Sequence, residues 1–467
     1  MTRTKSIQEA GNGVDWSAAL SGHGPRYLQI VRFLERAMAE GHLRPGDRLP
    51  PQRDLAGQLH LDLTTVTRAY AEARGRDLIH ARGALGTYIS TPKVELAPIV
   101  DLSMNIPPPP ASVDFTDLLR RGVEQVLTRA DANMLMTYHP GGGSKADREA
   151  GAIWLAPVLG RVEPARIVTS PGAQAALAAL ILALTKPGDA IVTESMTYPG
   201  LLGASRQLSR RIVVADRDAH GMTPEALESA YRKEGAKVVY LNPTMQNPTT
   251  RTMPEHRRRD IARVAAKHDI QIIEDDPYWR LAEDAPPSLS HWAPGQVHYI
   301  STLSKCLTPG LRTAYVVSPD DNARIRFLAA LRAATLMSTP LMTSVATQWI
   351  HDGSAIQLLE GVKNEAHARQ QLAEHILTDG SQHWPAGGIH IWYELPDSWT
   401  TQALAIAARL EGLAVTSSDA FAAGSESATA IRISLGGVKD RARLGQALQR
   451  LADLIRRGPD SFEPVVI

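Results

Sequence analysis

Short apolar runs alternate with longer stretches of helical periodicity over much of the chain beyond residue 160. The apolar runs cover residues 166–169, 190–193, 211–214, 237–241 and 270–274, and helical patterns occur at 174–184, 200–207, 224–233 and 255–268. Continuous apolar strands joined by crossover helices are typical of a mostly parallel sheet with helices on both faces. Ligands bind such sheets at the carboxyl ends of the strands. Polar residues directly after each run are therefore candidate site residues.

The first 90 residues follow a different pattern. Residues 1–20 show no periodicity, whereas helical patterns at 25–40, 52–59 and 63–74 precede a glycine-containing hairpin at 82–89. This order predicts a winged helix-turn-helix, whose third helix enters the major groove of DNA and whose wing lies along the backbone. Hydroxyl and guanidinium groups suit phosphate and base contacts, and the candidates are Arg53, Thr64, Thr65, Thr67, Arg68 and Arg82. A small helical bundle that binds no DNA fits the pattern equally well.

Prolines separate the two patterns. Pro92 and Pro98 interrupt regular structure, and residues 107–110 are four consecutive prolines that form a stiff segment. We expect a mainly α winged helix-turn-helix domain at residues 1–90, a linker at 91–100 and an α/β domain at 101–467. Beyond about residue 345, long helices and the apolar runs 388–393 and 430–434 predict a small α+β domain that closes over the ligand site.

Composition narrows the function classes. The 467 residues are 43% apolar and 21% charged, as expected for a globular protein of two or three domains. A net charge of +1 means that any nucleic-acid site is a local patch. The single cysteine, Cys306, excludes an internal disulfide framework, and no Cys/His cluster has zinc spacing. No signal peptide and no apolar run of membrane-spanning length is found, so we expect a cytoplasmic protein without a metal site.

A lysine follows the predicted strand at 297–300. Residues 301–312 place Thr302, Ser304, Lys305 and Arg312 at one end of the sheet. A lysine can form an imine with an aldehyde, while hydroxyls and a guanidinium can hold a phosphate. An aldehyde that carries a phosphate is pyridoxal 5'-phosphate (PLP). By itself, however, such a serine-lysine pattern is usually a surface lysine in a polar loop.

The other strand ends supply the remaining groups of a PLP site. Residues 170–176 form a glycine turn before a helix, which is an anion site built from backbone N–H groups. Tyr198 offers an aromatic face, Asn247 an amide, Asp275 a carboxylate and Tyr278 a phenol. Each group alone is ordinary turn chemistry. Together, at consecutive strand ends, they favour a cofactor site.

Three segments of the N-terminal region carry a family resemblance. Residues 49–56 (LPPQRDLA), 65–70 (TVTRAY) and 86–88 (GTY) resemble the GntR family of DNA-binding domains over about residues 22–90. Residues 111–467 resemble the fold-type I aminotransferases, so the whole chain is similar to the MocR subfamily of GntR regulators, which fuses the two parts. The resemblance implies a winged helix-turn-helix followed by a PLP-dependent transferase fold. One position departs from it, because Leu63 stands where the family usually has an arginine that contacts a base.

The aminotransferase resemblance assigns roles around the cofactor ring. It implies that Lys305 forms the internal aldimine and that Asp275 pairs with the pyridinium nitrogen. Asn247 and Tyr278 would bond the phenolate oxygen of the cofactor, and Tyr198 would stack on the ring.

The same resemblance also implies which residues bind the phosphate of the cofactor and the carboxylate of a substrate or effector. The phosphate ligands would be the backbone N–H groups of Ala173 and Gln174 and the side chains of Thr302, Ser304 and Arg312. Tyr138 would reach the phosphate of a neighbouring subunit, which implies a homodimer. Arg432 would clamp the α-carboxylate of a substrate or effector.

These features lead to a functional hypothesis with an alternative. The fused DNA-binding domain favours a PLP-dependent transcription regulator that senses an amino compound by external aldimine formation at Lys305. The alternative is an active aminotransferase in which Lys305 also transfers the proton. A DNA-binding protein with a degenerate, cofactor-free body is disfavoured by the intact Lys305, Asp275 and Arg312.

Overall fold

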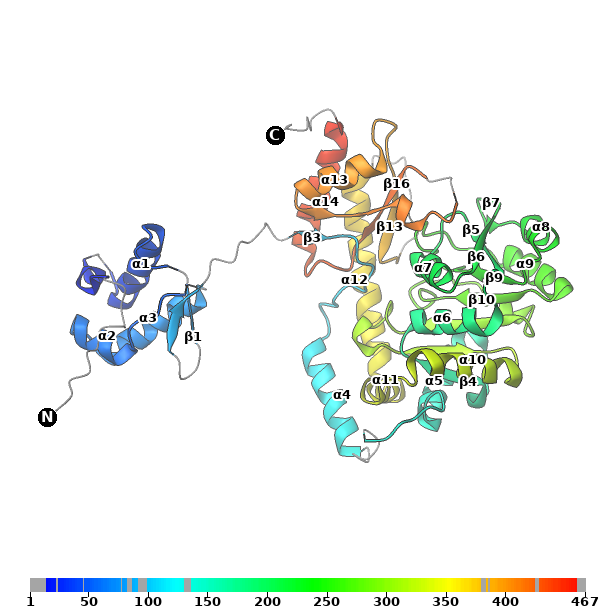
Figure 1. Ribbon diagram of the computed structural model, residues 1–467, viewed down its shortest axis with the longest axis horizontal. Coiled ribbons are helices and arrows are strands. Elements are labelled where there is room, and N and C mark those ends of the chain that lie inside the picture. The colour runs from blue at the N-terminus through cyan, green and yellow to red at the C-terminus, as the bar shows by residue number, and fades with distance from the viewer. Residues whose placement is uncertain are drawn as a thin grey trace. The chain divides into compact units, whose positions relative to one another are not determined.

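The computed structural model describes residues 14–21, 24–44, 46–76, 78–81, 86–90, 99–129, 136–378, 384, 387–424 and 428–459 (Figure 1). The chain divides into two compact units, Met1–Ala97 and Pro98–Ile467. In the described part, no helix is long and apolar enough to cross a membrane.

The first unit is a winged helix-turn-helix. Its elements are α1 (Arg26–Ala39), α2 (Gln52–Leu59), α3 (Leu63–Gly75) and the antiparallel strands β1 (Ile79–Ala81) and β2 (Thr87–Ile89). Buried Val66, Ala69, Tyr70 and Ala73 recur at helical spacing along α3, and Ile79 and Ile89 close the same core from the strands. These elements match the predicted pattern.

One element of this unit differs from the sequence-based prediction. Residues 16–20 form a 3-10 turn, η1 (Trp16–Leu20), in a stretch expected to be irregular. The Asp15 side chain caps the turn, and the buried Trp16 ring lies 5.4 Å from the ring of Phe33 in α1. Five residues are too few to show a helical repeat, so no periodicity marked this turn.

The second unit contains a seven-stranded sheet in the order β4-β12-β11-β10-β9-β5-β6. The strands are β4 (Ile167–Ser170), β5 (Ala190–Glu194), β6 (Arg211–Ala215), β9 (Val238–Leu241), β10 (Gln271–Asp275), β11 (Val297–Thr302) and β12 (Ala314–Val317). Only β12 runs antiparallel to its neighbours in this sheet. The sheet is therefore mostly parallel, as predicted. The connection from β11 to β12 is too short for the crossover that parallel strands require.

Helices cover both faces of this sheet (Figure 1). One face packs on α6 (Ala173–Leu184), α7 (Pro199–Gln207) and α10 (Asp321–Thr335), and the other packs on α5 (Lys145–Leu159), α8 (Pro224–Glu234), α9 (Glu255–His268), α11 (Pro340–His351) and α12 (Ser354–Leu377). In β9, Val238 and Tyr240 belong to the first face, whereas Val239 and Leu241 belong to the second. This alternation is the period of a strand that is buried on both faces.

A smaller α+β domain completes the second unit, as predicted. The strands β13 (His390–Glu394), β16 (Ala430–Ser434) and β15 (Thr416–Ser417) form an antiparallel sheet beside α12, α13 (Thr401–Leu410) and α14 (Arg441–Arg457). The strand β3 (Val100–Asp101) pairs with β14 (Leu413–Ala414), so the start of this unit belongs to the small domain. The remaining elements are α4 (Phe115–Arg129), η4 (Pro164–Arg166), β7 (Arg217–Asp218), β8 (Gly221–Met222), η5 (Leu289–His291), η6 (Pro309–Leu311) and η7 (Ser418–Phe421).

Candidate cofactor site and DNA-binding surface

Three parallel strands end at one edge of the sheet and bring the predicted residues together there. Asp275, the last residue of β10, lies opposite Ile300 of β11, and Lys305 follows the end of β11. β9 ends one residue before Asn242 and the loop that holds Asn247. Parallel strands place their carboxyl ends on the same side. Groups that are far apart in the sequence therefore lie near one another at this edge.

Asp275 has one carboxylate oxygen engaged and one free. Its Oδ2 accepts a hydrogen bond from the Tyr240 hydroxyl at 2.8 Å, whereas Oδ1 is buried without a hydrogen-bond partner among the described residues. Burial raises the pKa of the Asp275 carboxyl to about 6, although the Tyr240 bond and the Lys305 charge oppose this shift. A buried carboxylate oxygen without a donor is costly. It fits the protonated ring nitrogen of a bound pyridine.

Lys305 lies near Asp275, and its amine is weakly basic. Its Nζ donates a hydrogen bond to the backbone oxygen of Asn105 at 2.5 Å. Burial lowers the pKa of the Lys305 ammonium to about 8, and the Arg432 guanidinium lowers it further while Asp275 opposes. A lowered pKa increases the fraction of neutral amine, which is the form that attacks an aldehyde.

An anion cradle lies at the N-terminus of α6. Gly172, the N-cap, has φ +99°, and a Cβ there would come within 2.7 Å of Arg312 Nη2. The Arg312 side chain is anchored by a hydrogen bond from Nη2 to the Pro171 carbonyl oxygen at 3.1 Å. The first residues of α6, Ala173 and Gln174, therefore present backbone N–H groups beside a guanidinium. This arrangement suits a phosphate.

Two hydroxyls stand on the turn after β11. The Thr302 hydroxyl bonds the Ser304 hydroxyl at 3.1 Å and accepts a hydrogen bond from the Ser304 backbone N–H at 3.2 Å. The turn that carries Lys305 is thus held in one shape by its own polar groups.

Two tyrosines lie near Asp275. Tyr198, the N-cap of α7, is half-buried, and its pKa is raised by burial and then by the charge of Asp275, while Arg312 and Arg432 oppose. Tyr278 is buried, and its hydroxyl accepts a hydrogen bond from Asn105 Nδ2 at 2.9 Å. Burial also raises the pKa of Tyr278. Both phenols are therefore neutral donors at physiological pH.

Arg432 in β16 reaches across from the small domain. Its Nη1 donates to Asn247 Oδ1 at 2.9 Å and its Nη2 donates to the backbone oxygen of Ser103, while Cζ lies 4.9 Å from the centre of the Phe421 ring. The Arg432 Nε is buried and has no hydrogen-bond partner in the described part of the chain. A buried guanidinium with only neutral acceptors suits a carboxylate ligand.

Some of the predicted DNA-contacting side chains already contact other residues of this unit. Arg53 and Thr64 are exposed, whereas Thr65 is half-buried. The Thr67 hydroxyl donates to Gln52 Oε1 at 2.9 Å, and the Arg68 guanidinium lies 4.1 Å from the centre of the Tyr27 ring. The predicted contact Arg82 lies outside the described residues.

A groove on this unit adds a residue that the sequence analysis did not name. It runs between the start of α2, the start of α3 and the wing, and Arg48, Arg53, Leu63, Gly86 and Thr87 are among its lining residues. Arg48 pairs with Tyr88 through a β-bridge, and a Cβ on Gly86 would lie 2.9 Å from Arg48 Nε. The absent side chain of Gly86 therefore leaves room for the Arg48 guanidinium.

Comparisons with known proteins agree with both halves. The model of the bacterial regulatory proteins of the gntR family matches residues 26–89, and the model of aminotransferase class I and II matches residues 97–451. The HTH-type transcriptional regulator YdeF of Bacillus subtilis (strain 168) is 30% identical over 441 residues, which cover 92% of this chain and 94% of YdeF.

Two further similarities come from a repressor and from an enzyme. The vitamin B6 salvage pathway transcriptional repressor PtsJ of Salmonella typhimurium is 27% identical over 449 residues, covering 90% of this chain and 98% of PtsJ. The structure of Pyrococcus horikoshii kynurenine aminotransferase in complex with PMP superposes with a TM-score of 0.69 at 26% identity, covering 78% of this chain and 92% of that one.

The chain belongs to the class I and II aminotransferase family. With a gntR-type DNA-binding domain in front, it has the architecture of the MocR subfamily of transcription regulators.

The MocR-type site contains a residue that sequence reasoning missed. Asn105 bonds Lys305 through its backbone oxygen and Tyr278 through its side chain, and its Nδ2 lies 3.2 Å from His390 Nδ1. Its Oδ1 is buried without a partner within the described residues. Asn105 lies 200 residues before Lys305, so no local pattern could have connected them. Tyr240 was missed for a related reason, since it stands inside an apolar strand.

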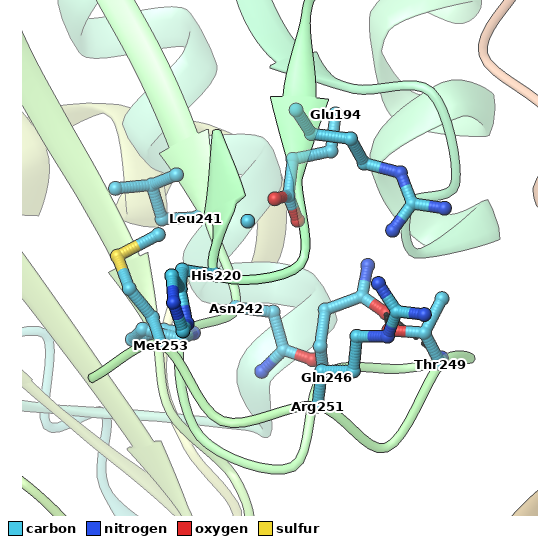
Figure 2. A pocket seen from close by; sticks show the side chains of 11 residues that line it. Glu194, His220, Leu241, Asn242, Gln246, Thr249, Arg251 and Met253 are labelled. Atoms are coloured by element: carbon cyan, nitrogen blue, oxygen red, sulfur yellow. Dashed lines mark hydrogen bonds between the residues drawn. The ribbon is translucent and has the colours of Figure 1, made fainter. Parts of the chain in front are cut away.

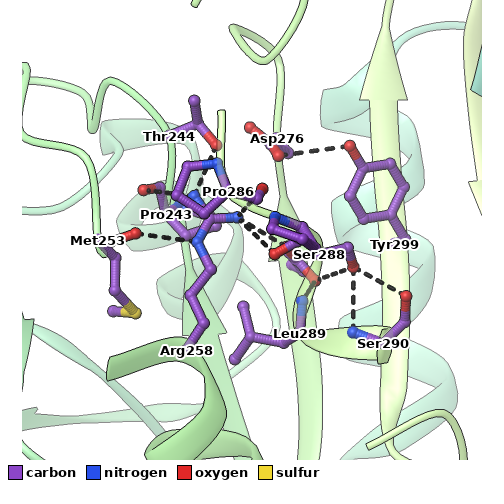
Figure 3. A network of polar contacts seen from close by, with 12 residues as sticks. Pro243, Thr244, Met253, Arg258, Asp276, Pro286, Ser288, Leu289, Ser290 and Tyr299 are labelled. Atoms are coloured by element: carbon purple, nitrogen blue, oxygen red, sulfur yellow. Dashed lines mark hydrogen bonds and ion pairs between the residues drawn. The ribbon is translucent and has the colours of Figure 1, made fainter. Parts of the chain in front are cut away.

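A buried network of polar contacts supports the loop after β9 (Figure 3). Arg258 is fully buried and donates to the Pro243 carbonyl oxygen at 3.1 Å and to the Thr244 hydroxyl at 2.9 Å, while its Nη1 lies 3.7 Å from Glu274 Oε1. Glu274 precedes Asp275 and faces the opposite side of β10. Burial raises the pKa of the Glu274 carboxyl to about 8, although Arg258 opposes. Glu274 therefore lies beside the Arg258 network, whereas the neighbouring Asp275 contacts Tyr240.

A second polar niche lies against the same loop (Figure 2). Figure 2 shows Glu194, Asn242, Gln246 and Arg251 around one space. Glu194 Oε1 accepts a hydrogen bond from the Met222 backbone N–H at 2.7 Å, and Gln246 Nε2 donates to the Met196 carbonyl oxygen at 2.6 Å. Both sides of the loop that carries Asn247 are thus fixed by polar contacts.

Tyr138 stands apart from the other predicted residues. Its side chain is 76% exposed and makes no hydrogen bond to them in the described part of the chain. The structure therefore does not bring Tyr138 together with the other predicted cofactor residues.

Proposed function

We propose that this regulator binds PLP through Lys305 and changes its DNA binding in response to an amino compound. The observation that carries the proposal is that the buried Asp275 Oδ1, which has no hydrogen-bond partner among the described residues, lies near a lysine of lowered pKa. A ring nitrogen and an aldehyde at opposite ends of one small molecule would satisfy both groups. The aminotransferase relative that is bound to PMP supports the same cofactor class.

When bound, PLP supplies an aldehyde that reacts with primary amines and a ring that withdraws electrons. The residues of this chain hold and orient it. Asp275 keeps the ring nitrogen protonated, because a carboxylate partner favours the charged form. Asn247 and Tyr278 hydrogen-bond the ring oxygen, and Tyr198 covers the ring face.

The phosphate is held at the cradle. The ligands are the backbone N–H groups of Ala173 and Gln174, the hydroxyls of Thr302 and Ser304, and Arg312. Tyr138 of a second subunit completes the shell, so we propose a homodimer.

The effector is an amino compound whose carboxylate pairs with Arg432. A carboxylate at this point gains two charge-assisted hydrogen bonds and replaces the neutral acceptors Asn247 and Ser103. The amino group of the effector then lies beside Lys305.

The N-terminal domain reads DNA with α3, and the dimer presents two such readers to two half-sites. We propose domain bounds of 1–90 for the reader, 91–100 for the linker and 101–467 for the sensor.

The proposal is tested by spectroscopy and footprinting on the full chain. Wild-type protein with PLP should gain a visible absorption band that borohydride fixes, and Lys305→Ala should lose this band. Lys145→Ala is a matched control, since that lysine is on the surface in an exposed ion pair. A footprint on DNA that shifts when candidate amino acids are added would support sensing. A protein that stays colourless with added PLP would refute the cofactor assignment.

A second candidate is an aminotransferase. The pKa of about 8 at Lys305 favours it, because an amine of this basicity can both accept and donate a proton near neutral pH. Release of a keto acid from an added amino acid at a steady rate, in the presence of a second keto acid that accepts the amino group, would establish this activity.

A further inference from the structure

Leu63 is an apolar side chain at the start of α3, the helix expected to enter the major groove of DNA. It is the first residue of α3, and the first residues of a recognition helix contact base edges. Its side chain is 41% exposed, whereas Val66, Ala69, Tyr70 and Ala73 of the same helix are buried in the core. The core therefore does not account for a leucine at this position.

Two positive side chains lie near Leu63. The groove that Leu63 lines also holds Arg48 and Arg53, with Asp54 as the one carboxylate among its described lining residues. Arg48 stands against the wing at Gly86 and Arg53 is on α2, so the two guanidinium groups come from different elements beside the start of α3. Guanidinium groups in this arrangement suit phosphates on both sides of a groove. Phosphate contacts there would hold Leu63 against the base edges.

A leucine can read only one feature of a major groove. It has no donor or acceptor, so a guanine or adenine edge next to it would lose its hydrogen bonds to water without replacement. The 5-methyl group of thymine is the apolar feature that the major groove offers. We propose that Leu63 contacts a thymine methyl group and gives this regulator a thymine preference at one position of each half-site. The inference rests on the proposed DNA binding by the N-terminal domain.

The test removes the 5-methyl group of each thymine in the DNA and leaves every other group unchanged. Full-length protein is used to select duplexes from a random pool, and each thymine of the enriched sequence is then replaced by deoxyuridine, which keeps all hydrogen-bonding groups. Binding is measured by fluorescence anisotropy at one fixed salt concentration. We expect one thymine per half-site whose replacement weakens binding about fourfold, the value of one buried methyl group.

Variants connect this effect to the leucine. With Leu63→Ala, the thymine and deoxyuridine duplexes should bind equally, while Leu410→Ala, an exposed leucine of the other unit, should keep the wild-type difference. Leu63→Arg should move the preference at that position to guanine, which a guanidinium bonds through O6 and N7.

The outcomes separate the two proposals. If the protein retains no duplex from the pool at low salt, DNA binding itself is refuted, and this inference with it. If duplexes are retained but no sequence is enriched, DNA binding stands and the thymine contact is overturned. If a sequence is enriched but no thymine is sensitive to deoxyuridine, or if Leu63→Ala keeps the sensitivity, DNA binding stands and the thymine contact is overturned.

Discussion

The rate at which the protein captures PLP at different pH values tests the environment of Lys305. Burial lowers the pKa of its ammonium from 10.5 to about 8. At pH 7 roughly a tenth of the Lys305 amines are then neutral, about 300 times the neutral fraction of a lysine with the ordinary pKa. Only the neutral amine attacks an aldehyde. At saturating PLP, we expect the capture rate to rise about tenfold between pH 6 and pH 7 and to level off above the pKa.

Two substitutions should move this midpoint in opposite directions. Arg432 lowers the pKa of Lys305, so Arg432→Gln should shift the midpoint to higher pH. Asp275 raises the pKa of Lys305, so Asp275→Asn should shift the midpoint to lower pH. Arg161→Gln, at a highly exposed site, is the control that should leave the midpoint unchanged.

The assay mixes cofactor-free protein with PLP in a stopped-flow instrument and follows visible absorbance from pH 6 to pH 10. A rate that does not depend on pH below 8 would contradict the lowered pKa. A shift of both variants in the same direction would show that the two charges do not act on Lys305 as the structure implies.

Three further predictions concern single side chains. Asp275→Ala should keep most of the PLP affinity, since the phosphate contacts remain, but should slow the spectral change on adding an amino acid by at least about tenfold, the effect of about 1.4 kcal/mol. Arg53→Ala should weaken DNA binding on all sequences and reduce the slope of log K against log salt by about 1, as measured by anisotropy in a salt series. Arg432→Ala should keep PLP and the basal footprint yet lose the footprint change with amino acids; an unchanged response would mean that the effector lacks a carboxylate clamp.

The fold was predictable where an apolar pattern is continuous. The helix expected at 255–268 coincides with α9 (Glu255–His268), and the strand expected at 237–241 contains β9. The antiparallel β12 was not expected, because alternation of strands and helices describes only the parallel part of the sheet. The turn η1 was missed because it is shorter than two helical turns.

The candidate site was predictable where its residues follow strands. Asp275 and Lys305 lie at or just after the ends of strands, and their carboxylate and amine groups mark them as candidates for a cofactor site. Asn105 and Tyr240 were not predictable in the same way, because their roles come from contacts with residues 200 and 35 positions away. Likewise, the engagement of Thr67 by Gln52 depends on how α2 and α3 pack, which no local pattern encodes.

Ser103 and Asn105, which follow the boundary between the two units, contact Arg432 and Lys305 through their backbone oxygens. The backbone oxygen of Ser103 accepts from Arg432, that of Met104 accepts from the Ser434 hydroxyl, and that of Asn105 accepts from Lys305. Under the proposed function, Lys305 would give up its bond to Asn105 on reaction with an aldehyde, and Arg432 would give up its bond to Ser103 on pairing with a carboxylate. An effector can change DNA binding only through different affinities for two arrangements of the protein. The two exchanges would act on Ser103 and Asn105, which lie six and eight positions after Ala97, the end of the DNA-binding unit. The shortest stretch of chain from the proposed ligand site to the DNA-binding domain therefore starts at Ser103 and Asn105, whose carbonyl groups Arg432 and Lys305 would release.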